Sequence, residues 1–234
     1  LSEASNTPVM LELRIRATHV YGRFTCKDNV APRISSKHRI EPAPSDYARL
    51  VLPPSSFDQD RDKVARRLPA ARDFILREGL NELVAGARED IGIILQGGLY
   101  NAVMAGLREL GCGDVFGRSE VPMLVLNVTY PIVPQQVLDF CRGKRAVLMV
   151  EEGHPAYLEQ ELNALLRKAA IDTELCGKDV LPEAGEYTAQ AVLDGLAAFL
   201  ARFKPEVAPR HASLHAAAQA RPAELQGENL ARPA

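Results

Sequence analysis

Tryptophan is absent from the 234 residues, aromatic residues make up only 6%, and cysteine occurs four times. No two of them form a CxxC pair, since they are Cys26, Cys112, Cys141 and Cys176. The cysteines alone therefore predict neither a metal site nor a redox motif. Dispersed cysteines of this kind are typical of a reducing compartment, where they serve as small core residues. We therefore expect a cytoplasmic location.

Long apolar runs and a charge imbalance are also missing. No run approaches the roughly 20 residues that a membrane helix needs, and the first residues lack a signal pattern. With 28 Lys+Arg against 30 Asp+Glu, the net charge is -2, so the chain lacks the excess of basic residues that is typical of nucleic-acid-binding proteins. The sequence predicts neither a membrane nor a nucleic-acid partner, and its composition is that of a globular domain. Because the chain begins with Leu1, we expect it to be a fragment or a processed product.

The first third of the chain predicts little regular structure. Apolar residues at every second position from Val9 to Ile15 are typical of one strand, and a lone strand needs a sheet supplied by residues before Leu1. Several prolines interrupt residues 21–59, which we interpret as an irregular connector. A helix is predicted over 60–88, ended or kinked by Pro69. The connector and its helix together span residues 21–89.

A repeated order of strand, loop and helix begins near Asp90. Strands are predicted at 91–95, 123–128, 146–150 and, more weakly, 172–176, and each interval has room for one helix. Pro134 and Pro155 suit the first turn of two of these helices, and Thr188 suits the N-cap of the last. The pattern predicts an α/β fold, a mostly parallel sheet with helices on both faces.

This compact domain is expected to span residues 90–203. Residues 204–234 are rich in Pro, Ala, Arg and Gln and have few bulky apolar side chains. We interpret them as a linker or disordered tail, although the Ala-rich parts also suit a helix.

Ligands of open parallel sheets bind beyond the carboxyl ends of the strands, where three loops fall. The Gln96-Gly97-Gly98 turn either presents N–H groups to an anion or is a tight turn that requires glycine, and we favour the latter. Glu151-Glu152-Gly153-His154-Pro155 suits either acid–base chemistry or a helix N-terminus stabilised by a carboxylate. We favour the helix N-terminus, leave an interface role open, and do not expect Glu151 and Glu152 to act as a pair, since neighbouring strand residues face opposite sides.

Asn127 and Tyr130 follow the second predicted strand and place an amide and a phenol either in a cleft or on an extended loop shaped by prolines. Arg16 and His19 follow the first strand and are candidates for lining a site with upstream residues. The five histidines look scattered, without a pair at metal spacing, so no metal ligand and no catalytic residue are assigned.

The order of several short motifs resembles the 2-oxoacid:ferredoxin oxidoreductases, over most of Thr7 to Phe203. The resemblance rests on four motifs in order. The motif "GII..G..Y" corresponds to Gly92-Ile93-Ile94 with Gly97 to Asn101, and "YP.P" corresponds to Tyr130 to Pro134. The motif "VEE..P..E" corresponds to Val150 to Glu161, and "GK..LP..GE.T" corresponds to Gly177 to Thr188. Thr7-Pro8-Val9-Met10 with Arg16 and His19 resembles the end of the family's thiamine-pyrimidine-binding domain.

The resemblance implies a transketolase C-terminal-like domain at 90–203 and, at 1–20, the tail of a pyrimidine-type domain. The family's complete enzymes use thiamine diphosphate, Mg²⁺ and [4Fe-4S] clusters to decarboxylate 2-oxoacids, here aryl pyruvates, to acyl-CoA, and they pass electrons to ferredoxin. Arg16 and His19 would face the cofactor half. We expect none of these cofactors to be bound by this chain alone, because it has no Gly-Asp-Gly diphosphate segment and no cysteine cluster.

These departures predict a chain that is inactive alone and serves as a scaffold and interface part of such an enzyme. Its partners would be other domains or subunits of the same enzyme, in a homo-oligomer or larger assembly. Asn127, Tyr130, Glu152 and His154 are the candidates for an interface or substrate entrance. The alternative is a stand-alone interaction or regulatory module with the same fold and no chemistry; an independent nucleotide- or CoA-binding protein ranks last, because Gln96-Gly98 is not a strong phosphate loop.

Overall fold

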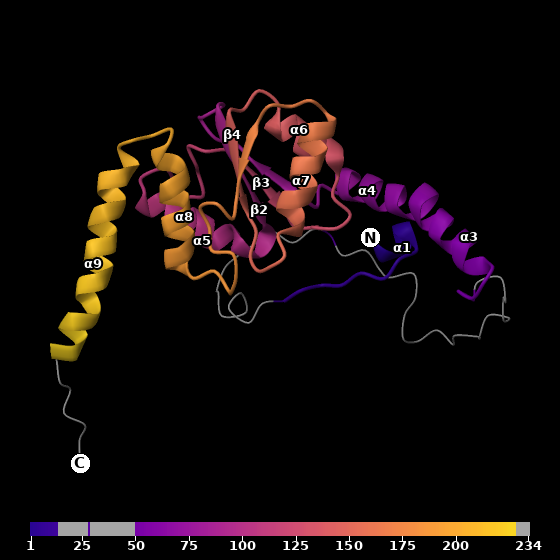
Figure 1. Cartoon of the computed structure of the whole chain (residues 1–234), viewed down its shortest axis with the longest axis horizontal. Helices are drawn as coiled ribbons and strands as arrows, with labels where there is room; N and C mark the ends of the chain where they lie inside the picture. Colours follow the sequence, from indigo (N-terminus) through magenta and orange to yellow (C-terminus); the bar gives the residue numbers. More distant parts are fainter. Residues whose placement is uncertain (14–27, 29–49, 228–234) are drawn as a thin grey trace, which may run out of the picture. The chain divides into compact units, whose positions relative to one another are not determined.

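The computed structural model describes residues 1–13, 28 and 50–227, and the chain divides into two compact units, Leu1–Phe74 and Ile75–Ala234 (Figure 1). The first unit contains the short helix α1 (Ser2–Ser5) and most of a helical run that begins at Ser55. The second unit contains a five-stranded sheet with its covering helices. The second unit therefore carries the strand-end side chains that the sequence singled out.

The helical run continues through Pro69 without a break. It comprises α3 (Ser55–Asp62), a π-helical turn (Lys63–Arg67) and α4 (Leu68–Arg77). Proline has no N–H, and its ring crowds the carbonyl one turn earlier. The widened π-helical turn lies directly before α4 and gives Pro69 that space. Of the two outcomes expected at this residue, an end or a kink of the helix, the end is therefore wrong.

The run instead ends at Arg77, two residues before Gly79, which corrects the helix predicted to Arg88. Gly79 has a positive φ of 58°, and the N–H of Leu80 reaches back to the carbonyl of Ile75 at 3.0 Å. This is the glycine-terminated pattern that stops a helix. The chain is then free to form β1 (Glu82–Val84), where the sequence predicted more helix.

The sheet has the strand order β1-β3-β2-β4-β5. Parallel ladders join β2 (Ile91–Gln96), β3 (Met123–Leu126), β4 (Ala146–Val150) and β5 (Glu174–Cys176), and β1 pairs antiparallel with β3 at one edge. All residues of β3 and β4 are buried, as expected for parallel strands covered on both faces. The predicted mostly parallel sheet is confirmed.

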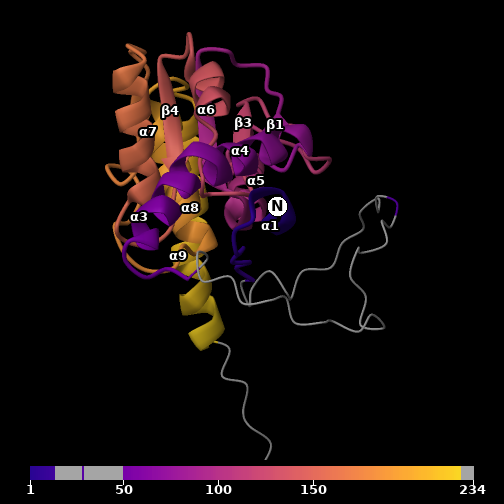
Figure 2. The ribbon, with the colours of Figure 1, turned by 90° about the vertical axis from the view of Figure 1, so that its right-hand side faces the viewer.

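Helices cover both faces of this sheet and give three layers (Figures 1 and 2). On one face, Ile91, Ile93 and Leu95 pack in a core with α5 (Tyr100–Glu109) and α8 (Ala189–Ala201). On the other face, Ile94 and the alternate residues of β3 pack in a second core with α6 (Pro134–Cys141) and α7 (Tyr157–Lys168). The alternation along β2 therefore supplies both cores, and the predicted αβα architecture is confirmed.

The predicted helix starts agree with the structure at two of three positions. Pro134 is the first residue of α6, and the Thr188 hydroxyl accepts the N–H of Ala191 at 3.1 Å as an N-cap of α8. The helix after Pro155 begins two residues later, at Tyr157. Gly97–Leu99 forms a 3₁₀ turn that leads from β2 into α5.

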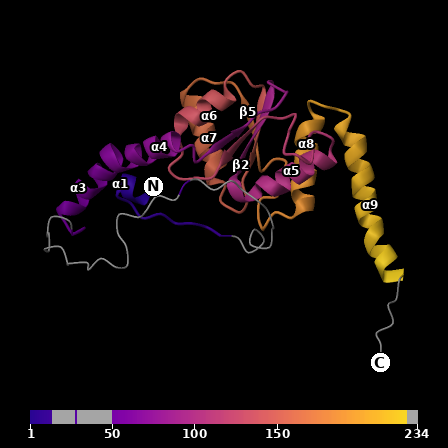
Figure 3. The same ribbon diagram turned by 180° about the vertical axis from the view of Figure 1, so that it is seen from behind.

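A further helix, α9, occupies Val207–Gly227. The Ala-rich parts of the tail are therefore helical over this segment, as the helical alternative predicted. Val207 is 1% exposed and belongs to the core around α8. Seen from behind, α8 and α9 lie next to each other, joined by the short turn after Ala201 (Figure 3).

The strand predicted from Val9 does not form in the part of it that the structure describes. Residues 8–13 have neither helix nor strand, and Met10 and Leu11 are 96% and 77% exposed. Alternating apolar residues form a strand only where a ladder partner is present, and no described residue pairs with this segment. Arg16, His19 and most of the predicted connector lie outside the described residues. None of the described helices has the length and apolar character needed to cross a membrane.

Candidate functional site

The three predicted loops meet at one edge of the sheet, because β2, β3 and β4 run parallel and end there. The first link between them is Gln96, the last residue of β2. Its side-chain oxygen accepts the backbone N–H of Glu152 at 3.0 Å, which ties the end of β2 to the loop after β4.

Asn127 connects the end of β3 to the segment before β1. Its amide nitrogen donates to the carbonyl of Leu80 at 2.9 Å and to the carboxylate of Glu82 at 2.8 Å. Its amide oxygen lies so close to Gly97 that a Cβ added to the glycine would stand 2.2 Å away. Gly97 is thus required by the close approach of Asn127, which agrees with the tight-turn interpretation of Gln96-Gly98.

Glu151 is directed into the first turn of α7. The residue is 5% exposed, and its two carboxylate oxygens accept the backbone N–H groups of Leu158 and Glu159, each at 3.0 Å. These donors are among the N–H groups that a helix start leaves without intrahelical partners. The favoured interpretation, a helix N-terminus stabilised by a carboxylate, matches this geometry.

Glu152 holds a different segment. One of its carboxylate oxygens accepts the backbone N–H of Tyr187, whose ring is buried in the core. Glu151 and Glu152 therefore diverge toward separate backbone donors. This agrees with the expectation that the two carboxylates do not work as a pair.

Lys178 is the centre of the contacts between these segments. Its ammonium donates to the backbone carbonyl of Glu151 at 2.6 Å, to the Tyr187 hydroxyl at 2.7 Å and to the carbonyl of Pro182 at 3.2 Å. It also lies 4.8 Å from the centre of the Tyr187 ring. Its own backbone N–H donates to the carboxylate of Glu159 at 3.0 Å.

Burial and charge act in opposite directions on Lys178. Desolvation lowers the pKa of the Lys178 ammonium, while the carboxylates of Glu151, Glu159 and Glu152 oppose that shift. Burial, with the same carboxylates, raises the pKa of Tyr187 to about 12. Near neutral pH the Tyr187 phenol therefore stays neutral, and its oxygen accepts the hydrogen bond from Lys178.

We call this set of side chains the strand-end network: Gln96, Asn127, Glu151, Glu152, Glu159, Lys178 and Tyr187. Lys178 and Tyr187 carry no assigned role in the sequence, although both lie in the "GK..LP..GE.T" motif. Their partners are 27 and 35 residues away along the chain, at Glu151 and Glu152. The motif was the available signal, but periodicity alone does not pair residues over such distances.

The predicted site residues fall into three groups. Asn127 and Glu152 belong to the strand-end network and bind other parts of this chain. Tyr130, 69% exposed, and His154, also exposed, lie on the loops of the same edge and face solvent. Arg16 and His19 lie outside the described residues.

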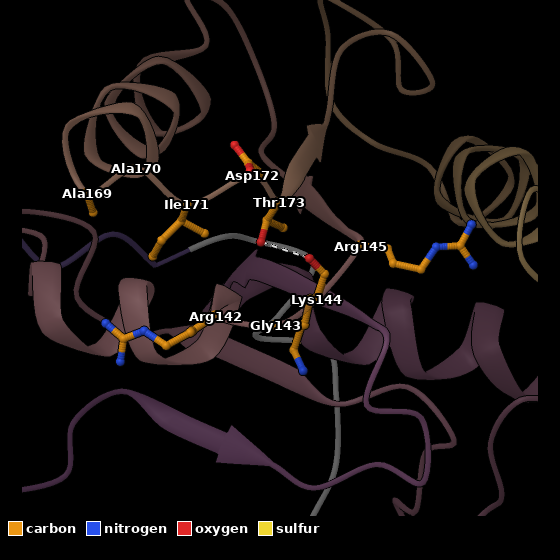
Figure 4. Close-up of a pocket in the computed structure, with 9 residues that line it drawn as sticks. All are labelled: Arg142, Gly143, Lys144, Arg145, Ala169, Ala170, Ile171, Asp172 and Thr173. Atoms are coloured by element: carbon orange, nitrogen blue, oxygen red, sulfur yellow. Dashed lines mark hydrogen bonds between the residues drawn. The ribbon is translucent and has the colours of Figure 1, made fainter.

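A cavity of about 430 Å³ lies at the opposite end of the strands, between the residues before β4 (Arg142–Arg145) and those before β5 (Ala169–Thr173) (Figure 4). The Thr173 hydroxyl, which lines it, lies 2.8 Å from the carbonyl oxygen of Cys141 and 2.9 Å from that of Lys144, so its one proton is shared between the two acceptors. The basic side chains do not converge on it: Arg142 pairs with Asp139, while Lys144 lies over the ring of Phe140 and Arg145 over that of Phe203. This cavity therefore lacks the convergent polar groups of a binding site.

The described cysteines do not suit an iron–sulfur cluster, which needs converging thiolates. Cys112, Cys141 and Cys176 are buried in the protein. Burial raises the pKa of each thiol, to about 11 for Cys141 and Cys176. Among the residues that the structure describes, the group of His, Cys, Asp and Glu side chains close enough to share a metal ion contains no cysteine.

The strand-end edge does not suit thiamine diphosphate either. Three of its carboxylates, those of Glu151, Glu152 and Glu159, surround one ammonium that already donates to three oxygens of the chain. A diphosphate needs N–H donors and cations, and this edge would repel it.

Sequence comparison relates the chain to one group of enzymes. No protein-family model matches it. It is 30% identical over 190 residues to the indolepyruvate oxidoreductase subunit IorA of Methanothermobacter thermautotrophicus, covering 80% of this chain and 29% of that protein. The corresponding subunit of Methanothermobacter marburgensis is 28% identical over 195 residues, 82% of this chain and 29% of that protein. That of Thermococcus kodakarensis is 24% identical over 200 residues, 86% of this chain and 30% of that protein.

Among solved structures, a 2-oxoglutarate:ferredoxin oxidoreductase from Magnetococcus marinus aligns with 66% of this chain and 24% of its own, at 17% identity and a TM-score of 0.42. The sequence matches, together with the order of the motifs, relate the chain to a segment of the indolepyruvate oxidoreductase subunit IorA. The chain spans less than a third of the length of the curated relatives it matches.

Proposed function

We propose that this chain is a scaffold and interface portion of a thiamine diphosphate-dependent indolepyruvate:ferredoxin oxidoreductase, the complete form of which decarboxylates aryl 2-oxoacids to acyl-CoA. Thiamine diphosphate, Mg²⁺ and the [4Fe-4S] clusters, together with the contacts to ferredoxin and coenzyme A, belong in this proposal to other parts of the complete enzyme. The proposal rests on the sequence relationship to a segment of IorA and on the chemistry of the strand-end edge.

The single observation that carries the scaffold role is that the motif side chains bind other parts of the same chain. Glu151 accepts two N–H groups of α7, Glu152 accepts the N–H of Tyr187, and Lys178 donates to three oxygens. A catalytic acid or base needs to reach a substrate proton. These groups instead fix the loops after β4 and β5 against each other, which favours a structural role.

The same edge also offers groups for a neighbour. Tyr130 and the exposed His154 lie on loops that the strand-end network holds in place, and Tyr157 is the first residue of α7; the two tyrosines are 69% and 68% exposed. Tyrosine is enriched at protein interfaces, because it brings a large apolar surface with one polar group. We propose that these three side chains contact a neighbouring domain or subunit of the same enzyme, or a second copy in a homo-oligomer.

The test is a Tyr130→Ala/His154→Ala double variant in the complete enzyme. Loss of two interface anchors should weaken subunit association at least tenfold, and activity should fall with the assembled fraction. Analytical ultracentrifugation and steady-state kinetics measure the two effects. Arg108→Ala, at an exposed position of α5, is the control and should leave both unchanged. Unaltered assembly, kcat and KM in the double variant would refute the interface assignment.

A further inference from the structure

Three metal-ligating side chains meet between α8 and α9. Asp194 comes from α8, and His211 and His215 come from α9. One ligand atom of each residue lies within 4.8 Å of the other two. This group belongs neither to the strand-end network nor to the cavity at the opposite end of the strands.

The helix α9 brings the two histidines together. Residues four apart lie on the same face of a helix, one turn apart. The sequence suggested scattered histidines without a pair at metal spacing, because residues 204–234 were interpreted as a linker. The structure corrects this: His211 and His215 are four residues apart on a helix that packs along α8 (Figure 3).

The distances within the cluster are close to those of a coordinated ion. Nε2 of His211 lies 2.6 Å from Oδ1 of Asp194, and Nδ1 of His215 lies 4.0 Å from the same oxygen. Ligands at zinc bond lengths in a tetrahedral site are about 3.3 Å apart, between these two values. Small side-chain rotations would therefore bring the three atoms to one ion.

The solvent exposure of the three side chains and the orientation of the Asp194 carboxylate also suit a bound ion. The side chains of Asp194, His211 and His215 are 42%, 26% and 45% exposed, so an ion can reach them from solvent. Gln190, one turn earlier on α8, donates to Oδ1 of Asp194 at 2.8 Å. A hydrogen bond of this kind fixes the direction of a ligating carboxylate.

We propose that Asp194, His211 and His215 bind a divalent transition-metal ion, with zinc as the best match, and that this ion fastens α9 to α8. Two neutral imidazoles and one carboxylate suit zinc, whereas Mg²⁺ and Ca²⁺ prefer ligand sets made of oxygen. A water molecule takes the fourth position. The hydrogen bond between His211 and Asp194 already connects the helices, so His215 is the residue whose removal separates metal binding from that bond.

The experiment is zinc titration by calorimetry on the purified 234-residue chain and on His215→Ala, with Glu161→Ala, at an exposed position of α7, as the control. The wild type and the control should bind one zinc at this site, and affinity should fall at least tenfold in His215→Ala. Zinc should also raise the melting temperature of the wild type and the control more than that of His215→Ala, since a ligand of the folded state stabilises it.

Two further measurements keep the test decisive. His215→Gln retains a polar side chain at this helix position and replaces the alanine variant if circular dichroism shows that the latter is unfolded. Co²⁺ bound to the wild type should give d–d absorption without a thiolate-to-cobalt band, because no cysteine belongs to the cluster. Equal zinc affinity in the wild type and the His215 variants, no zinc binding by the wild type, or a thiolate band would each overturn the proposal.

Discussion

Glu151 is an acidic residue at a position that the fold buries, and its partners explain why. Both carboxylate oxygens accept N–H groups at the start of α7, and that helix packs Leu158, Leu162 and Leu166 into the second core. The charge is therefore stabilised by backbone donors rather than by solvent. Of the segment that suits either acid–base chemistry or a helix N-terminus in the sequence, Glu151 serves the helix N-terminus in the structure.

Glu151→Ala should lower the free energy of unfolding by about 1–2 kcal/mol, because two N–H groups of α7 lose their acceptor. Urea denaturation of the chain measures the change. The control is Glu161→Ala, at an exposed position in the same helix, which should stay within about 0.5 kcal/mol of wild type. Equal effects of the two substitutions would contradict the capping role.

Tyr187 should make stability depend on pH in the alkaline range. Its pKa rises from 10.0 to about 12 on folding, so between these values the folded state keeps a proton that the unfolded state has lost. Stability should therefore fall as pH rises from about 10 to about 12, and this slope should be smaller in Tyr187→Phe. The lowered pKa of Lys178 acts in the opposite direction, but only below its ordinary value of 10.5.

Denaturation midpoints at a series of alkaline pH values test this slope, and phenolate absorbance provides an independent check. The wild type should show a titration component near pH 12 that Tyr187→Phe lacks. Identical pH profiles of the two proteins would show that the phenol is not held neutral by its surroundings.

Among the elements, the ends of β2 and β3 are coupled through Gly97 and Asn127. A methyl group at position 97 would stand 2.2 Å from the Asn127 amide oxygen, so Gly97→Ala should destabilise the chain by about 1–3 kcal/mol. Adding Asn127→Ala removes that oxygen. The double variant should therefore be more stable than the sum of the two single effects predicts, by at least 0.5 kcal/mol, a coupling that a double-mutant cycle measures. Additive effects would show that the two residues do not interact.

The elements that the sequence predicted well are those with a dense apolar signal. The strands β2, β3 and β4 were predicted from their unbroken apolar runs, and Pro134 and Thr188 marked two helix starts through local chemistry. Such signals are contained within a few neighbouring residues.

The missed elements depend on weaker or more distant information. Gly79 stops the helix before β1, a strand of only three residues, and α9 has only a weak apolar stripe along its length. The contacts of the strand-end network were not predicted, because Lys178 contacts Glu151 only once β4 and the segment after β5 are folded side by side. A linear pattern does not contain that pairing.

For the molecule as a whole, the relationship to IorA and the chemistry of the described residues lead to one account. The chain matches a segment of a much longer enzyme, its motif side chains hold its own loops together, and its described cysteines are buried thiols. In the function proposed above, a part of this kind would supply shape and contact surfaces, and the cofactors would bind elsewhere in the complete enzyme.

The most direct test is calorimetric titration of thiamine diphosphate in the presence of Mg²⁺, on the 234-residue chain and on the complete enzyme. The account predicts saturable binding by the complete enzyme and no binding heat with the chain alone. Stoichiometric binding of thiamine diphosphate by the chain itself would contradict it, because the cofactor site would then lie among residues that are assigned here to a scaffold.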